Sequence, residues 1–143
     1  MVEQLSVFLE NKAGRLAEMA VILGQAGHNM RALMVADTAE YGVARILVDR
    51  PHAAQVLLQE AGYGVALTQV VAVEVPDTPG GLGGILTALG VAEVNIEYAY
   101  VFVRPRGDAA VDIFRIEDVD VGARALRDAG FELVPAEALY TID

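Results

Sequence analysis

The sequence predicts an α+β protein built from two copies of one folding unit, each an antiparallel sheet with helices on one face. The first observation is a repeat: Asn11–Leu16 returns sixty-six positions later as Asp77–Leu82. The two segments align without a gap as far as Asn29 and Asn95, which indicates that a whole supersecondary unit is repeated. The second observation is periodicity, which gives the order strand, helix, strand, strand, helix, strand in each copy.

Composition excludes several classes of protein. The 143 residues carry a formal net charge of −10, which repels phosphate backbones and anionic lipids, so we expect no nucleic-acid and no membrane partner. Cysteine is absent, which excludes disulfides and thiolate chemistry. No apolar run approaches a membrane span and the N-terminus lacks a signal-peptide pattern, so we expect a cytoplasmic protein.

The first strand and helix of each copy are amphipathic. Residues 4–10 alternate, with apolar side chains on a core face and Gln4, Ser6 and Glu10 on a polar face that also carries Phe8. The helices that follow each predict one buried stripe, and glycines mark their exits. The stripes are Leu16, Met19, Ala20 and Leu23 in the first copy and Leu82, Ile85, Leu86 and Leu89 in the second, and the exit glycines are Gly24, Gly27 and Gly90.

The second strands, Met30–Thr38 and Ile96–Arg104, are apolar on both faces. Strands of this kind are covered on both faces. If the helices cover one face, another domain, another subunit or a ligand must cover the other. This pattern favours a homodimer or a tight pseudo-dimer of the two copies.

The remaining elements follow the same order in each copy. Hairpin turns at 39–42 and 105–108 lead into third strands at 43–49 and 110–117, and second helices follow, the first beginning at Pro51. Fourth strands start after Gly62 and Gly130. No linker separates the copies, so we place the boundary at Thr68–Gln69 and divide the chain into 1–68 and 69–143. Pro135 breaks the last strand and leaves 138–142 as a short edge strand or tail.

This order of elements is that of the ferredoxin-like fold, βαββαβ. At its first loop the chain also resembles the ACT family of amino-acid-sensing domains. The signature of that family is an Asp or Asn, two residues, a Gly and an aliphatic helix, ending in a Gly-x-Asn-Ile-like entry to the second strand. It reads here as Asn11–Gly14 with Gly27–Met30, and as Asp77–Gly80 with Glu93–Ile96. The resemblance covers nearly the whole chain twice, and its departures are Ala13 for Pro, Met30 for Ile and Glu93 for Gly.

In similar domains, free amino acids bind at the seam between two ACT units. The resemblance implies that N–H groups at the helix start take the carboxylate and that Asn or Asp oxygens accept from the ammonium. A structural role stays open, because Asn and Asp before a helix are commonly N-caps and Gly there is commonly conformational. The implied ligand-binding residues are Asn11, Ala13, Gly14, Arg15, Leu16, Asn29 and Met30, then Asp77, Gly80, Gly81, Leu82, Asn95 and Ile96.

Other chemistry has no support in the sequence. Gly80–Gly84 lacks the Lys-Ser/Thr of a phosphate loop. His28 and His52 are not spaced as metal ligands, and we expect them to be solvated or loop residues. The one serine, Ser6, has no His near it in sequence, and no carboxylate pair has an acid/base context. We therefore expect no catalytic residue, no metal, no cofactor and no enzyme activity.

The resemblance implies a free-standing regulatory protein that binds an amino acid at the seam and reports its level allosterically to a metabolic enzyme or regulator. Of the two sites, the first is the more neutral, since Asp77 and Glu93 add negative charge near the second. The alternative is a ligand-free interaction or regulatory subunit that dimerises and docks on a metabolic enzyme. The sequence leaves open which amino acid binds and whether the seam lies within one chain or between two.

Overall fold

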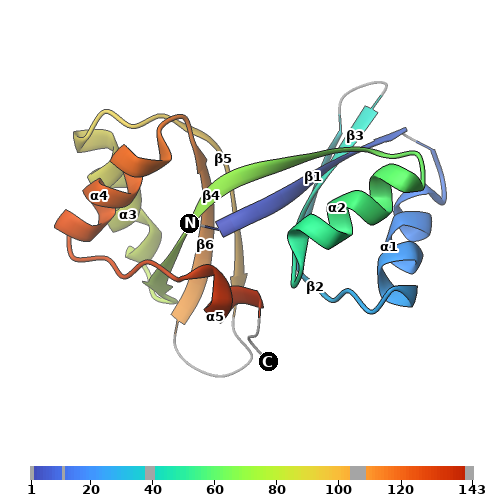
Figure 1. Ribbon diagram of the computed structural model, residues 1–143. Helices are drawn as coiled ribbons and strands as arrows, with labels where there is room; N and C mark the ends of the chain where they lie inside the picture. The colour runs from blue at the N-terminus through green and yellow to red at the C-terminus, as the bar shows by residue number, and fades with distance from the viewer. Residues whose placement is uncertain (1, 11, 38–40, 104–108, 141–143) are drawn as a thin grey trace. The chain divides into compact units, whose positions relative to one another are not determined.

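The computed structural model describes residues 2–10, 12–37, 41–103 and 109–140 (Figure 1). Their order is strand, helix, strand, strand, helix, strand, then helix, strand, strand, helix and a last short helix. The elements are β1 (Val2–Glu10), α1 (Arg15–Gln25), β2 (Met30–Asp37), β3 (Tyr41–Val48), α2 (Pro51–Glu60), β4 (Gly64–Pro76), α3 (Gly81–Val91), β5 (Ile96–Val103), β6 (Ala109–Ile116), α4 (Val119–Asp128) and α5 (Ala136–Tyr140).

The chain divides into two compact units, and β4 contributes to both. The first unit holds Glu3–Thr68 together with Leu139 and Tyr140, and the second holds Val2 and Gln69–Ala138. The change from one unit to the other therefore falls inside a continuous strand, without a linker. The ends of the chain are exchanged: Val2 lies in the unit of the second copy, and Tyr140 lies in that of the first.

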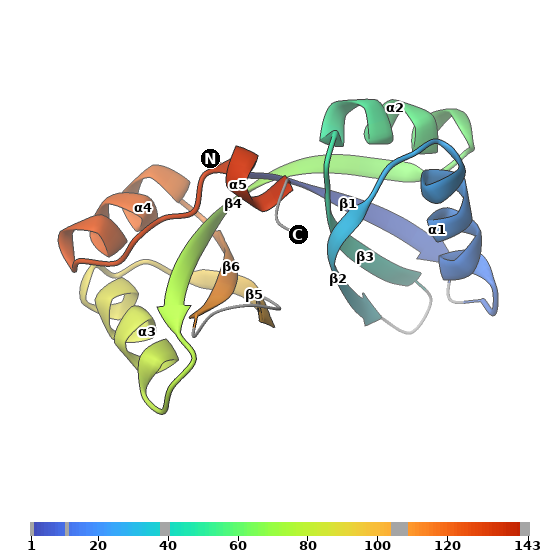
Figure 2. The ribbon, with the colours of Figure 1, turned by 90° about the horizontal axis from the view of Figure 1, so that it is seen from below.

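In the first unit the strands lie in the order β2-β3-β1-β4, and α1 and α2 cover one face (Figure 2). Because β1 pairs antiparallel with β3, Leu5 lies opposite Ile46 and Val7 opposite Ala44 on the helix side. This confirms the predicted α+β class with antiparallel strands. The core is formed by Leu5, Val7, Leu9, Met19, Leu23, Ala44, Ile46, Val48, Ala54, Leu58 and Tyr63.

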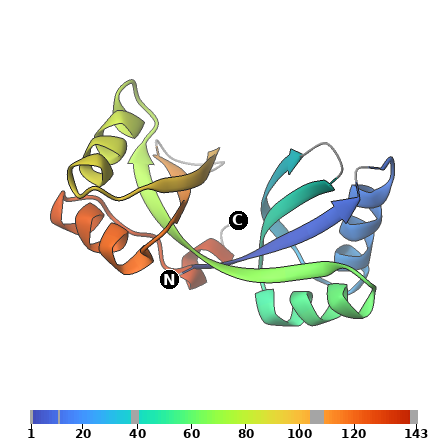
Figure 3. The same cartoon turned by 90° about the horizontal axis from the view of Figure 1, so that it is seen from above.

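The second unit repeats this arrangement with the strand order β4-β6-β5 and with α3 and α4 on one face (Figure 3). Val71 lies opposite Phe114 in the antiparallel pair of β4 and β6. The predicted fourth strand of this copy is reduced to one bridge between Val73 and Leu133, because the chain turns away at Pro135. Its core is formed by Val71, Val73, Val75, Ile85, Leu89, Ala110, Phe114, Ile116, Val119, Ala123 and Leu126.

The end of the described chain is helical, so the edge strand or tail expected at 138–142 is wrong for residues 138–140. The short helix α5 buries Leu139, and the Tyr140 hydroxyl donates to the Glu3 carbonyl at 2.8 Å. The same hydroxyl lies 3.2 Å from the Glu3 amide, which donates to it. A tertiary contact thus decides the conformation of a segment whose sequence showed no helical period.

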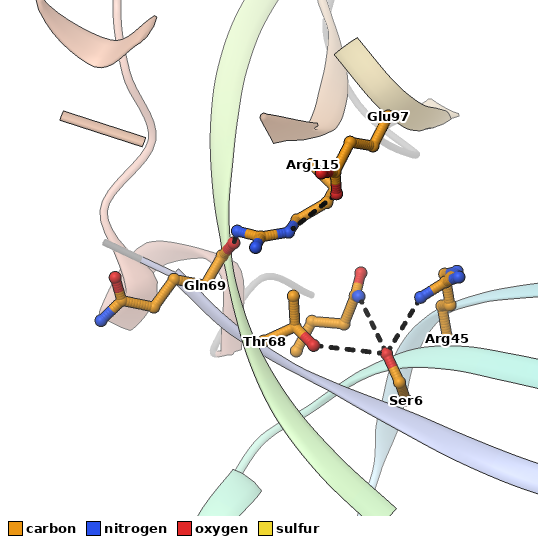
Figure 4. A network of polar contacts seen from close by, with 7 residues as sticks. Ser6, Arg45, Thr68, Gln69, Glu97 and Arg115 are labelled. Carbon is orange, nitrogen blue, oxygen red and sulfur yellow. Dashed lines mark hydrogen bonds and ion pairs between the residues drawn. The ribbon is translucent and has the colours of Figure 1, made fainter. Parts of the chain in front are cut away.

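The polar side of β1 is solvated only at its end, which corrects the expectation for Gln4 and Ser6. Both are buried, and the Ser6 hydroxyl collects several contacts within the first unit (Figure 4). Its oxygen lies 3.1 Å from Arg45 Nη1, 3.4 Å from Thr68 Oγ1 and 3.5 Å from Gln4 Nε2. Buried polar groups need hydrogen-bond partners. These contacts supply them, so Gln4 and Ser6 can be buried although they lie on the polar face of the strand. Phe8 is exposed, as expected.

Arg115 makes a different set of polar contacts in the second unit (Figure 4). Its Nη1 donates to the Gln69 carbonyl at 3.0 Å, and its Nε lies 3.3 Å from the Glu97 carboxylate. Polar side chains therefore hold β4 on each side of the Thr68–Gln69 boundary.

Several predicted core residues are half-exposed. Leu82 and Leu86 of α3 are 45% and 41% exposed, so the buried stripe of that helix is reduced to Ile85 and Leu89. On the edge strands, Leu33 and Val35 of β2 and Val101 of β5 are also exposed. The second strands are therefore not covered on both faces within their own units.

Both first helices end with a residue in the left-handed region. Gly27 has φ +80° at the end of α1, and Glu93 has φ +57° at the equivalent place after α3. The N–H of the next residue, His28 or Val94, bonds back to Leu23 or Leu89 at 2.9 Å, as in a Schellman cap. Glu93 is the only non-glycine residue with positive φ in the described ranges. The entry to the second strand therefore has the same backbone geometry in both copies, although Glu93 replaces the glycine in the second.

We predict that Glu93→Gly raises the free energy of unfolding by about 1 kcal/mol, because it removes the left-handed strain of a residue with a Cβ. Urea denaturation of the two proteins at neutral pH measures the change. Gly27→Ala is the matched control, and it should lower stability by a similar amount. A loss of stability in Glu93→Gly would contradict this assignment.

Candidate functional site

The two loops that the sequence singled out have the same backbone structure. Gly14 and Gly80 precede α1 and α3 with φ of +89° and +87°, a region that glycine enters without strain. The N–H of the first helical residue bonds back into the loop, from Arg15 to Lys12 at 3.4 Å and from Gly81 to Thr78 at 3.1 Å. Neither helix has a side-chain cap. Asn11, which the sequence placed in the first site, lies outside the described residues.

Helix α1 begins with free N–H groups. The Arg15 amide is already used by the Lys12 carbonyl, while the helical amides of Leu16 and Ala17 have no acceptor among the described residues. In α3 the corresponding amides belong to Leu82 and Gly83. The helix dipole adds partial positive charge there, so each start can accept an anionic group.

Side chains surround the first helix start and make it a cluster. The Arg15 guanidinium lies over the ring of Tyr63, with its carbon 5.1 Å from the ring centre, and its Nη1 lies 3.0 Å from the Glu18 carboxylate. Tyr63 precedes β4 and is 5% exposed. Its hydroxyl and the Arg15 Nε are both buried, and neither has a hydrogen-bond partner within the described ranges. We call Arg15, Glu18 and Tyr63 the Arg15 cluster.

The Arg15 cluster perturbs the tyrosine. Burial raises the pKa of Tyr63, the nearby Glu18 carboxylate raises it further, and the Arg15 charge opposes them. Glu18 is close enough to interact weakly with the hydroxyl, but no described acceptor meets the geometry of a hydrogen bond. The hydroxyl therefore stays protonated at neutral pH and is available as a donor.

The second helix start has none of these side chains. Gly81 and Gly84 stand at the positions of Arg15 and Glu18, and Phe131 stands at the position of Tyr63. A Cβ on Gly84 would lie 3.3 Å from the Phe131 ring, and a Cβ on Gly81 would collide with the Pro76 carbonyl. The backbone of the loop is thus preserved while its side-chain chemistry differs between the copies.

Within one repeat, the Asn at the entry to the second strand lies far from the loop. Gly14 and Asn29 flank the eleven-residue helix α1, so they lie at opposite ends of it, about 16 Å apart. The β2 residue level with the end of β1 is Asp37, but it lies two strands away, since Leu9 and Asp37 pair with Gly42 from opposite sides of β3. Met30 begins β2 next to Asn29, and Asn95 and Ile96 follow the same pattern in the second copy.

The far end of each first helix carries its own polar groups. His28 is buried with its Nδ1 3.5 Å from the Asp49 carboxylate, so it is a loop residue but not a solvated one. Asn29 donates its backbone N–H to the same carboxylate at 3.3 Å. In the second copy a hollow of about 520 Å³ lies there, lined by Glu93, Val94, Asn95, Glu117, Asp118 and Val121. Its acidic lining disfavours anions.

Asp112 is a second buried ionisable group that sequence reasoning missed. It lies on β6 opposite Val73 and Val101, on the face that carries Phe114, and it is 1% exposed. Its Oδ2 has no partner among the described residues, and burial raises the pKa of the carboxyl. Its parity was only a weak signal: Asp112 alternates with Ala110, Phe114 and Ile116, but the opposite face of β6 is also apolar at Val111 and Ile113. For Tyr63 the sequence signal was its alignment with Phe131 in the second copy.

The structure offers no other centre in its described part. No group of three or more His, Asp or Glu side chains there is placed to hold a metal ion. A cavity of about 170 Å³ beside β4 is mainly apolar, with Arg127 at its wall. Among the described helices, none has the length and apolar character needed to cross a membrane.

Comparison with known proteins extends these observations. The family model of the ACT domain pair matches residues 1–142. The chain is similar to protein BT0572 from Bacteroides thetaiotaomicron, with 34% identity, 98% of this chain and 96% of that chain covered, and a TM-score of 0.92. It is also similar to the ligand-free regulatory subunit of aspartate kinase from Thermus thermophilus, with 16% identity, coverage of 90% and 92%, and a TM-score of 0.66. The latter likeness shows the fold alone. No curated protein matches the chain.

We predict opposite effects for two alanine substitutions in α3. Gly81→Ala should lower the free energy of unfolding by about 1–3 kcal/mol, because its Cβ meets the Pro76 carbonyl. Gly83→Ala should raise it by up to about 1 kcal/mol, because a Cβ there meets open space and alanine favours helix. Thermal and urea unfolding compare the two, and equal effects would refute the tight contact at Gly81.

We predict that Asp112 makes the protein less stable as pH rises. Its native pKa lies above the unfolded value of about 4, so between the two the native state keeps a proton that the unfolded state has lost. Each pH unit of that window costs about 1.4 kcal/mol of stability. Urea unfolding from pH 4 to 8 should therefore show a steeper decline in the wild type than in Asp112→Asn. Asp128→Asn, on an exposed carboxylate, should follow the wild type, and parallel curves for all three would contradict the assignment.

Proposed function

The chain belongs to the family of ACT domain pairs, and we propose that it is a regulatory protein that binds a free amino acid at the start of α1. The observation that carries the proposal is the helix start itself. The amides of Leu16 and Ala17 have no described acceptor, no side chain caps the helix, and Gly14 leaves the backbone open. Uncapped amides at the positive end of a helix suit a carboxylate.

The second group of an amino acid, its ammonium, needs an acceptor. Within the first unit the Glu18 carboxylate lies in the first turn of α1, one turn from the helix start. Asn29 is too far from Gly14 to serve the same ligand in one repeat, so its proposed role requires a neighbouring unit. For the same reason we propose a homodimer, in which the partner contributes the residues at the start of its second strand to the ligand site.

The proposed readout is control of a metabolic enzyme or regulator. An ACT domain pair accounts for residues 1–142, and a separate regulatory subunit of aspartate kinase has a similar fold. In this proposal the bound amino acid stabilises one arrangement of the ACT units, and a partner that prefers that arrangement responds. The corresponding second site comprises Asp77 and the glycine-rich start of α3, and here too Asn95 and Ile96 would come from a neighbouring unit, since α3 separates them from the loop of their own repeat. We propose a weaker affinity for anions at this site, because Asp77 adds negative charge.

We predict that at least one common amino acid stabilises the protein. At a concentration of about one hundred times its Kd, such a ligand adds about 2.7 kcal/mol, which corresponds to a rise in Tm of about 5–10 °C. A thermal-shift screen of the common amino acids followed by calorimetry tests this. If no amino acid changes Tm or releases heat while the protein is folded, the proposal is wrong.

A second candidate function is that of a ligand-free interaction subunit. It is favoured by the exposed apolar residues of the edge strands, Leu33 and Val35 on β2 and Val101 on β5. Rows of this kind on an edge strand suit pairing with another chain. Sedimentation of Leu33→Lys with Val35→Lys discriminates the two functions: a change of assembly without any amino-acid response in the wild type favours the second.

A further inference from the structure

The Arg15 cluster holds two buried donors that lack an acceptor. The Nε–H of Arg15 and the hydroxyl of Tyr63 have no hydrogen-bond partner in the described parts of the chain. Buried polar groups without partners are rare in native proteins, because each costs free energy. Both lie at the start of α1, where the amides of Leu16 and Ala17 are also free. Every unsatisfied group at this place can donate a hydrogen bond, and only the phenol can also accept one.

An anion is the partner that such a set lacks. A guanidinium has five N–H donors and no acceptor, and it matches the planar, two-oxygen edge of a carboxylate. One internal carboxylate already uses part of it, since Glu18 lies 3.0 Å from Nη1. Glu18 is half-exposed, and its pairing with Arg15 is a surface ion pair of small free energy. A ligand carboxylate can therefore replace it.

The fold does not require these donors. In the second copy Gly81 and Phe131 occupy the positions of Arg15 and Tyr63, and the loop backbone is the same. Phenylalanine packs there against the glycine that replaces Glu18. The chain itself thus shows that the unit forms without the guanidinium and without the hydroxyl. Folding therefore does not explain why the first copy has Arg15 and Tyr63.

We propose that Arg15 and Tyr63 form the carboxylate subsite of the first repeat. The inference rests on the proposed function and specifies which side chains hold the ligand. In the free protein Glu18 occupies one edge of the guanidinium and covers the tyrosine. When an amino acid binds, its carboxylate takes the Arg15 Nε–H and the Tyr63 hydroxyl, and Glu18 is released toward the ammonium. One carboxylate replaces another, so the charge of the cluster is balanced in both states.

The test compares two tyrosines of the first unit. Tyr63→Phe removes an unpartnered hydroxyl and reproduces the residue of the second copy, so it should leave Tm unchanged or raise it. It should weaken binding of the amino acid found in the screen by about tenfold to a hundredfold, because a bond to a charged group is lost. Tyr140→Phe loses hydroxyl bonds to Glu3 and should lower Tm without changing the Kd. Unchanged affinity in Tyr63→Phe overturns the subsite while leaving amino-acid binding intact.

A second measurement keeps the subsite testable if no amino acid binds. The Arg15 Nε–H signal and the Tyr63 ring signals are followed by NMR during titration with propionate, butylamine and inorganic phosphate. Propionate alone should shift both sets, and Arg15→Gln should abolish the response of Tyr63. Shifts with propionate but with no amino acid would support the subsite and refute the proposed function. No response to propionate, or a stronger response to phosphate, would overturn the assignment to a carboxylate.

Discussion

The structure depends on the hydrogen bonding of one strand, β4. Its first residues belong to the first unit and its last residues to the second, and it crosses the boundary at Thr68–Gln69 without a break. In the second unit its residues from Val71 to Pro76 pair with β6. Because β4 is a neighbour of β1 in the first unit and of β6 in the second, the register of its two ends is set by different strands. At its centre, the Thr68 hydroxyl contacts Ser6 of β1 and the backbone carbonyl of Gln69 accepts from Arg115 of β6.

Repetition made most of the fold predictable. One copy alone would leave each short apolar run ambiguous, but two copies in register, such as Asn11–Leu16 and Asp77–Leu82, constrain the same assignment twice. The predictions failed where the copies or the tertiary contacts differ. Gln4 and Ser6 are buried because a network satisfies them, and α5 forms because Leu139 and Tyr140 find contacts near Glu3. Local sequence carries neither of these facts.

The site was predictable only at its backbone. The pattern of a glycine before a helix correctly located two uncapped helix starts at Gly14 and Gly80. It did not indicate Tyr63, which lies forty-eight residues beyond Arg15 in sequence and meets it only because α2 returns the chain to the same end of the sheet. The role of Asn29, which the resemblance places at the seam with a neighbouring unit, stays a prediction, since within one repeat the length of α1 separates it from the loop. Side-chain chemistry at a helix start depends on long-range neighbours.

The bonds of Tyr140 have a further consequence. Its hydroxyl satisfies both the N–H and the carbonyl of Glu3, near the beginning of β1. The pairing of β1 with β3 begins only at Leu5, so Glu3 lies before the first residue pair of that ladder. A single phenol thus gives two backbone groups at the start of β1 the partners that β3 does not supply.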